Sequence, residues 1–289
     1  MHYCDAKTLL SAQNGMNLYR GCTHGCIYCD SRSKCYRIEH AFEDVEVKRN
    51  APALLESALK SKRKRCMIAT GSMSDPYMPL EQELRLMRQC AELVERYGFG
   101  FTALTKSDLV LRDLDLYRAI HANGRCVLQM TLTTLDESLC RLLEPRVCGT
   151  ARRFDVLCRF RDAGVPAVVW ITPTLPFLND SEENLRGLLR YCFEAGVSGV
   201  LTFGMGVTLR EGDREYFYRR LDAHFPGMKQ RYIEAYGNAY VCPVPNEARL
   251  MRILSDECEA HGVLYQPEEI FAYLRAFDGA ARGGALTLF

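Results

Sequence analysis

Hydrophobic and polar positions along the chain fall into short apolar runs that alternate with longer amphipathic segments. Each apolar run leads into a glycine or a polar loop, which is the pattern of a buried strand. The predicted strands cover residues 66–70, 100–105, 125–133, 165–171 and 197–203. The segments between them repeat apolar residues at helical spacing and predict helices at 51–60, 80–97, 109–122, 152–163 and 182–195. Residues 14–20 are expected to form a first, short strand.

Strands that alternate with helices of this length imply βαβ units and therefore a parallel sheet. With the first strand, the chain has six such units, fewer than the eight that close a barrel. After residue 204 the alternation stops and an aromatic, basic segment follows at 214–224. The sequence therefore predicts an α/β fold with an open, six-unit barrel at 1–205. Residues 206–289 are expected to form a C-terminal extension packed on this barrel.

Composition places the chain among soluble globular proteins with a full core. Of its 289 residues, 48% are hydrophobic and 25% charged, and the formal net charge is +1. No global field therefore attracts nucleic acid or a membrane surface. The N-terminal residues do not show the charged-then-apolar pattern of a signal peptide, and no apolar run of about 18 residues is present that could span a bilayer. Fourteen cysteines without a secretion signal indicate reduced thiols. We expect a cytoplasmic protein.

Three of the cysteines stand within eight residues, at Cys22, Cys26 and Cys29, with the spacing C-x3-C-x2-C. Gly21 and Gly25 allow the backbone to turn the three side chains toward one point. Thiolates select iron–sulfur clusters, zinc or Cu(I), so the chemistry alone leaves several options. Four ligands would close a site, whereas three leave one position open for a substrate or cofactor. A zinc site completed by His24, or a chance grouping, remains an alternative at this point.

The cysteine loop, with the aromatic Tyr28 before its third cysteine, resembles the cluster motif of radical S-adenosylmethionine (SAM) enzymes. The resemblance implies that Cys22, Cys26 and Cys29 hold a [4Fe–4S] cluster whose fourth iron is chelated by SAM. It further implies a partial (β/α)6 barrel and reductive cleavage of SAM to a 5′-deoxyadenosyl radical that abstracts hydrogen from a substrate. An electron donor such as a flavodoxin or ferredoxin would then be a partner.

From residue 19 to 180 the chain is similar to the spore photoproduct lyase-like branch of this superfamily. The shared features are the cysteine loop, the 74–76 turn, and the segments 105–106, 111–116, 131–136, 143–146 and 173–180. By this resemblance, Ser74, Lys106 and Thr131 fall at positions that contact SAM.

SAM requires acceptors for its ammonium group, a cation for its carboxylate, partners for its ribose and an apolar slot for its adenine. The residues that follow successive strands supply these groups, because the carboxyl ends of parallel strands meet at one edge of the sheet. The expected SAM contacts are Ser72, Ser74 and Asp75 for the ammonium, Lys106 for the carboxylate, Thr131 for the ribose, and 173–175, including Leu175, for the adenine.

One position departs from the photoproduct lyases. Where their pattern has a hydrogen-donating cysteine, two residues before the serine of Ser-Asp-Pro, this chain has Ser72. A hydroxyl O–H is far harder to cleave homolytically than a thiol S–H, so Ser72 cannot replace that cysteine. The substrate and the catalytic residues are therefore not predicted, and photoproduct repair is not favoured unless a distant segment, such as that of Cys35 or Cys242, brings a thiol to this place.

Two other functions stay open from the sequence. A nucleic-acid lesion lyase is the alternative within the superfamily, and a nucleic-acid-binding module with a structural zinc site is the alternative outside it. Basic segments at 60–65 and 214–220 would serve either one, although 60–65 is also typical of a solvated helix C-terminus and 214–220 of an amphipathic helix docked on the barrel. No second C-x-x-C is present, so the sequence gives only weak support for an auxiliary cluster.

Overall fold

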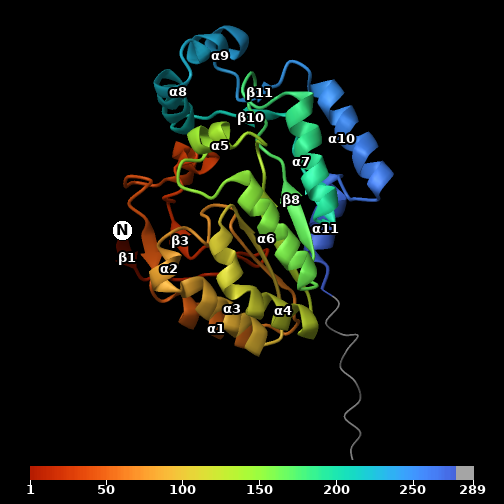
Figure 1. The fold of residues 1–289 in the computed structure, drawn as a ribbon. Coiled ribbons are helices and arrows are strands. Elements are labelled where there is room, and N and C mark those ends of the chain that lie inside the picture. Colours follow the sequence, from red (N-terminus) through yellow and green to blue (C-terminus); the bar gives the residue numbers. More distant parts are fainter. Residues whose placement is uncertain (278–289) are drawn as a thin grey trace, which may run out of the picture.

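A computed structural model describes residues 1–277 and contains a six-stranded parallel sheet (Figure 1). The strand order is β2–β5–β6–β7–β8–β9, so each strand lies beside the next one in sequence. Their bounds are Gly15–Met16, Met67–Thr70, Gly100–Thr105, Cys126–Thr131, Ala167–Trp170 and Gly199–Leu201. All five pairings are parallel. The predicted parallel α/β sheet of six strands is confirmed.

Five helices connect these strands and pack on one face of the sheet. They are α1 (Ala51–Ser61), α3 (Leu86–Arg96), α4 (Leu114–Asn123), α6 (Thr150–Asp162) and α7 (Glu182–Glu194). Successive strand residues point to opposite faces, so Phe101 and Ala103 of β6 join the core beneath these helices, while Thr102 and Leu104 line a cavity on the other face.

Two predicted elements are wrong in detail. The single helix expected at 80–97 is two helices, α2 (Glu81–Leu84) and α3, because Arg85 adopts φ 51°. The buried Glu81 side chain accepts the backbone N–H of Met87 at 2.9 Å and so caps the start of α3. The helix expected at 109–122 begins with a 3₁₀ segment, Asp108–Asp113, before α4. Helix propensity alone reveals neither the break at Arg85 nor the 3₁₀ segment.

The predicted first strand also divides. Its first part, β2, joins the main sheet, whereas β3 (Tyr19–Arg20) pairs antiparallel with β4 (Glu46–Lys48), which in turn pairs with β1 (His2–Cys4). This small sheet carries the chain directly into the cysteine loop. The short helix α5 (Glu137–Leu143) was not predicted.

Residues 206–277 pack on the rest of the chain at three places. They form β10 (Gly206–Thr208), α8 (Asp213–His224), α9 (Met228–Tyr236), β11 (Val241–Pro243), α10 (Glu247–His261) and α11 (Pro267–Arg275). Figure 1 shows α8 and α9 together at one end, and α10 beside α7. Helix α11 covers part of the cavity-bearing sheet face, where Ile270 and Leu274 contact Val127, Val168 and Leu201.

The remainder of the expected extension, 278–289, lies outside the described residues. Among the helices that the structure describes, none has the length and apolar character needed to cross a membrane.

Candidate functional site

The cysteine loop is held from one side by the segment that follows it. The backbone N–H of Cys22 donates to the Phe42 carbonyl at 3.0 Å. Gly21 reaches this position with φ +91°, and a Cβ there would lie 2.4 Å from the same carbonyl oxygen. Only glycine therefore fits, because both the backbone angle and the space exclude a side chain.

Gly21→Ala is expected to lower the free energy of unfolding by about 2–3 kcal/mol, because left-handed strain is joined by a collision with backbone. Gly262→Ala is the matched control, since Gly262 has φ +65° but a Cβ added there would meet nothing within 4 Å. That variant should lose only about 1 kcal/mol. Urea unfolding of both variants measures the difference. Equal losses would show that contact with Phe42 does not restrict the loop.

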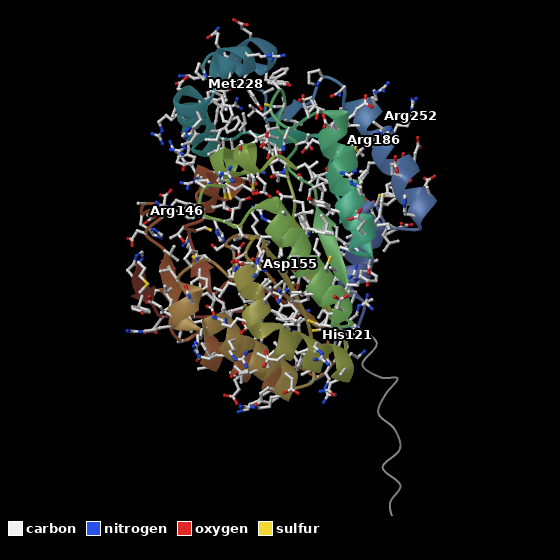
Figure 2. All side chains as sticks on the ribbon, viewed as in Figure 1. His121, Arg146, Asp155, Arg186, Met228 and Arg252 are labelled. Atoms are coloured by element: carbon white, nitrogen blue, oxygen red, sulfur yellow. The ribbon has the colours of Figure 1, made fainter. Side chains whose placement is uncertain are left out.

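The 143–146 segment holds the loop from the other side. Ile27 donates its backbone N–H to the Leu143 carbonyl at 2.9 Å, and Arg146 donates to the His24 carbonyl at 3.1 Å. Arg146, which stands at the loop surface, is labelled in Figure 2. These backbone bonds fix the middle of the loop, between its first and third cysteines.

A network of buried charged side chains connects the 143–146 segment to helix α6. The Tyr28 hydroxyl donates to Glu144, and Glu144 pairs with Arg153 of α6; both charged side chains are completely buried. Burial works to raise the pKa of Glu144, but Arg153 and Lys106 hold it below its usual value. Arg153 also donates to the Thr131 carbonyl at 3.1 Å. The network thus links the cysteine loop to the end of β7.

The three cysteines face a common space. Burial raises the pKa of the Cys26 thiol well above its usual value, Lys106 opposes this, and Glu144 and the two other cysteines add to it. Burial likewise raises the pKa of Cys22 to about 12, against the effect of backbone N–H groups from His24 and Asp75. Thiols with raised pKa values stay protonated at neutral pH unless a metal replaces the proton.

Asp75 joins this loop to the ends of two strands. Its carboxylate accepts from the Tyr77 N–H at 2.9 Å, the Thr105 hydroxyl at 2.7 Å and the Lys106 N–H at 2.8 Å. His24 Nε2 lies 3.2 Å from its second oxygen. Burial works to raise the pKa of Asp75, but His24 and these donors lower it to about 2. Its acceptor capacity is therefore largely used within the protein.

Two side chains near Asp75 have polar groups that remain available to a ligand. The Ser74 hydroxyl is buried and has no hydrogen-bond partner among the described residues. The Lys106 ammonium lies 6.0 Å from the Tyr28 ring centroid and forms no ion pair within 4.0 Å in residues 1–277. Although burial works to lower it, the pKa of Lys106 is raised, through its electrostatic interactions with Cys26 and Glu144. A buried hydroxyl and a charged amine are thus available beside the cysteines.

The other predicted contacts lie in different surroundings. Ser72 is exposed and lines a cavity of about 550 Å³ on the sheet face, together with Gln129 and Trp170. Thr131 is buried at the end of β7. Leu175 is completely buried, and its N–H donates to the Asn179 side chain.

The start of the expected adenine slot is more accessible than Leu175. Thr172 and Pro173, joined by a cis peptide, line a cavity of about 220 Å³ that also borders Tyr28 and Asp30.

Sequence reasoning did not identify Glu144 or Arg153 as members of the site, nor His24 except as an alternative zinc ligand. The sequence did give one indication of Glu144. It stands beside Pro145 in the 143–146 segment, which follows the strand predicted at 125–133.

This chain belongs to the radical SAM superfamily, whose family model matches residues 16–189. A relative from Mycobacterium tuberculosis, described as an uncharacterised protein, is 31% identical over 248 residues, covering 82% of this chain and 71% of the relative. An uncharacterised protein of Methanocaldococcus jannaschii is 31% identical over 169 residues, covering 58% and 62%. The predicted family is confirmed.

Solved structures of spore photoproduct lyase share the fold. A tyrosine-to-phenylalanine mutant of that enzyme has a TM-score of 0.67 at 14% identity, over 91% of this chain and 80% of the lyase. The lyase complexed with dinucleoside spore photoproduct has a TM-score of 0.65. The Streptococcus suis protein SuiB, bound to precursor peptide SuiA, has a TM-score of 0.54 at 13% identity, over 87% of this chain and 47% of SuiB.

Radical SAM enzymes use a [4Fe–4S] cluster and SAM, and the residues of this site fit both groups. Cys22, Cys26 and Cys29 supply thiolates of the kind that hold iron–sulfur clusters, and the unpartnered Ser74 hydroxyl suits a polar ligand beside them.

Proposed function

We propose that this protein is a radical SAM enzyme that binds a [4Fe–4S] cluster through Cys22, Cys26 and Cys29. The observation that carries the proposal is the placement of the Lys106 ammonium and the orphan Ser74 hydroxyl beside the three cysteines of the loop, of which Cys22 and Cys26 are buried. We further propose that the parallel sheet is an incomplete (β/α)6 barrel, with residues 206–289 as an extension on it.

In this proposal the cluster and SAM together supply a 5′-deoxyadenosyl radical when reduced by an electron donor, and the protein binds and orients them. Lys106 binds the methionyl carboxylate of SAM, because its ammonium has no ion-pair partner among the described residues. Ser74 accepts from or donates to the polar end of SAM. Thr131 lies at the ribose, and Thr172–Pro173 border the adenine in the cavity next to Tyr28.

Asp75 takes a positioning role here in place of the ammonium contact predicted from sequence. Its three hydrogen bonds join the loops after β5 and β6, and His24 brings it against the cysteine loop. Leu175 contributes through its buried side chain, which packs with Cys26 and Ile27.

Beyond the fold that this chain shares with spore photoproduct lyase, neither alternative function gains a supporting observation. Lesion lyase chemistry of the photoproduct type needs a thiol close to Ser72, and none of the described residues that line the Ser72 cavity is a cysteine. Cys35 is exposed beside Arg210, and Cys242 donates to the Ala239 carbonyl. The substrate is therefore one whose reaction does not depend on a thiol at this place.

The proposal is tested by anaerobic reconstitution with iron and sulfide, followed by addition of dithionite and SAM. We expect about four iron and four sulfide per chain, and slow release of 5′-deoxyadenosine without substrate. Candidate substrates can then be screened by the acceleration that they cause. Folded protein with no cluster absorbance and no nucleoside product would overturn the proposal.

Lys106→Met should weaken SAM binding roughly 10- to 100-fold, the effect of losing a charged hydrogen bond of about 1.5–3 kcal/mol. Calorimetric titration of reconstituted, oxidised protein measures the dissociation constant, and iron analysis shows that the cluster is retained. Lys229→Met serves as the control, because Lys229 forms an exposed pair with Asp222 away from the site. Unchanged SAM affinity in Lys106→Met would remove Lys106 from the binding site.

Ser74→Ala and Asp75→Asn should behave in opposite ways although they are neighbours. The Ser74 hydroxyl has no partner among the described residues, so its loss should leave the stability of the cluster-free protein nearly unchanged and weaken SAM binding. Asp75→Asn should lower the free energy of unfolding by about 1–3 kcal/mol even without SAM, because the amide NH2 that replaces one carboxylate oxygen cannot accept a hydrogen bond, so the donors on that oxygen lose their acceptor. Urea unfolding and SAM titration distinguish the two. A stable Asp75→Asn protein with weak SAM binding would instead support direct contact.

A further inference from the structure

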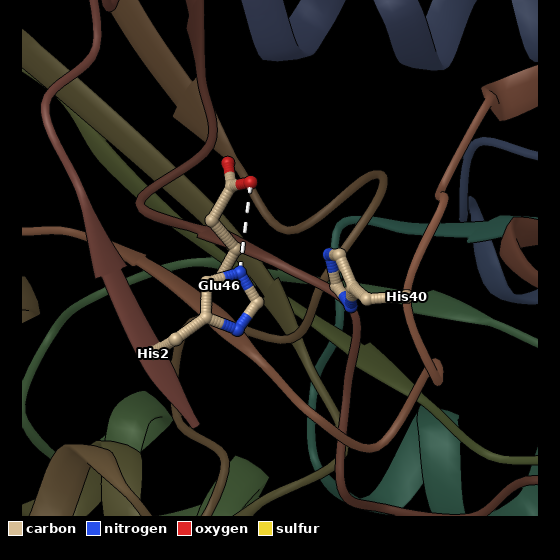
Figure 3. Close-up of side chains that lie close together, drawn as sticks. All are labelled: His2, His40 and Glu46. Carbon is tan, nitrogen blue, oxygen red and sulfur yellow. Dashed lines mark ion pairs between the residues drawn. The ribbon is translucent and has the colours of Figure 1, made fainter.

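A second group of ligand-type side chains lies in the small N-terminal sheet. His2 of β1, His40 of the loop before β4 and Glu46 of β4 place one ligand atom each within 4.8 Å of one another. Figure 3 shows the three side chains around one space, with the His2–Glu46 pair marked by a dashed line. His2 and Glu46 are direct partners in the parallel β1–β4 ladder, so their side chains share one face of this sheet.

Both imidazoles are already oriented by their second nitrogen. His2 Nδ1 lies 3.1 Å from an oxygen of Asp44, and His40 Nδ1 lies 2.9 Å from the Ala41 carbonyl. If Nδ1 carries the proton in each ring, Nε2 presents a lone pair. Histidines that bind metals almost always donate their other ring N–H to a carboxylate or a backbone carbonyl in this manner.

Nε2 is the remaining nitrogen of each ring. His40 Nε2 is buried and has no hydrogen-bond partner within residues 1–277. His2 Nε2 lies 3.9 Å from a carboxylate oxygen of Glu46, too far for a hydrogen bond. The two rings meet edge-on with centroids 4.8 Å apart. A buried acceptor without a donor costs free energy unless a ligand satisfies it.

We propose that His2, His40 and Glu46 bind one divalent transition-metal ion of the zinc class. Two imidazoles and one carboxylate form a donor set that zinc accepts, with the fourth position left to water. Asp44 and the Ala41 carbonyl orient the ligands. This site is separate from the cysteine loop and requires none of its residues.

The ion would stabilise the segment that supports the cysteine loop. His2 donates its backbone N–H to Val45 at 3.0 Å, and Phe42, between His40 and Val45, accepts the N–H of Cys22. Metal binding joins β1, β4 and the loop that carries His40, and so restricts the position of the Phe42 carbonyl. The ion therefore has a structural role in this proposal, and SAM cleavage does not pass through it.

The test uses tag-free holoprotein with its reconstituted cluster, first treated with EDTA and then desalted under anaerobic conditions. Titration with zinc chloride, followed by desalting and elemental analysis, should give one zinc per chain beyond the cluster iron. His40→Ala should lower zinc affinity by more than about 100-fold, since loss even of an outer-shell partner costs 10- to 100-fold. Glu46→Gln is a second variant of nearly unchanged shape, which keeps the test valid if His40→Ala does not fold.

Controls separate this site from adventitious binding. Glu39→Gln removes an exposed carboxylate next to His40 and should keep the full zinc content. The variant with alanine at Cys22, Cys26 and Cys29 should also retain one zinc, together with a zinc-dependent rise in Tm that His40→Ala lacks. Zinc that disappears with the three cysteines, or that persists unchanged in both His40→Ala and Glu46→Gln, would overturn the proposal. Failure of SAM cleavage in an otherwise zinc-loaded protein would count only against the proposed enzyme function.

Discussion

Cys26→Ala is expected to abolish both the cluster absorbance and the release of 5′-deoxyadenosine. Cys26 lies at the centre of the site, because its thiol interacts electrostatically with Cys22, Cys29, Lys106 and Glu144. Iron–sulfur clusters are held by cysteine thiolates, and the loss of one leaves two on this loop. Iron and sulfide analysis after anaerobic reconstitution, with a chromatographic assay of the nucleoside, measures the two effects.

The control for this variant is Cys158→Ala. Cys158 is a half-buried cysteine on α6, outside the cysteine loop. Its replacement should leave about four iron per chain and unchanged SAM cleavage. If Cys26→Ala retained the full cluster and the cleavage activity, the assignment of the three cysteines would be wrong. If both variants lost the cluster, the effect would reflect general damage to the fold.

Arg153→Met is expected to lower the free energy of unfolding by about 3–5 kcal/mol, the usual cost of removing one member of a buried ion pair. The variant leaves Glu144 buried beside the hydroxyls of Tyr28 and Thr133, without the guanidinium that balances its charge. Because Tyr28 immediately precedes Cys29, the reconstituted cluster should also be released more readily. Urea unfolding of the cluster-free protein, and the rate of iron transfer to a chelator, measure these effects.

Arg159→Met is the matched control on the same helix. Arg159 pairs with Asp155, which is labelled in Figure 2, and both side chains are largely exposed, at 57% and 42%. Such pairs contribute about 0.3–0.5 kcal/mol, so this variant should be nearly as stable as the parent protein. Similar losses in both variants would mean that the buried pair has no special role in holding the cysteine loop.

The pH dependence of the Glu144–Arg153 pair has a definite sign. The folded-state pKa of Glu144 is lowered relative to its usual value, so the folded state favours the ionised carboxylate. The stabilisation is present above the pKa of the unfolded chain and is lost as the pH falls through the folded value. In Arg153→Met this contribution disappears, so the acid limb of the stability profile should differ from that of the parent.

The parallel α/β sheet and the cysteine loop can be predicted from local sequence pattern. Local periodicity distinguishes buried strands from amphipathic helices, and parallel connectivity brings the ends of successive strands to one edge. The positions of Ser74, Lys106 and Thr131 at that edge follow from this alone. The spacing of Cys22, Cys26 and Cys29 likewise needs no tertiary information.

Which of those groups are free to bind a ligand depends on contacts between distant parts of the chain. Asp75 and Ser74 are adjacent in sequence, yet the carboxylate of Asp75 is engaged by distant donors while the Ser74 hydroxyl has none among the described residues. The pairing of His2 with Glu46 joins segments 44 residues apart through strand register. Hydrogen-bond satisfaction depends on side chains contributed from elsewhere in the fold, and such contacts leave no local periodic signal in the sequence.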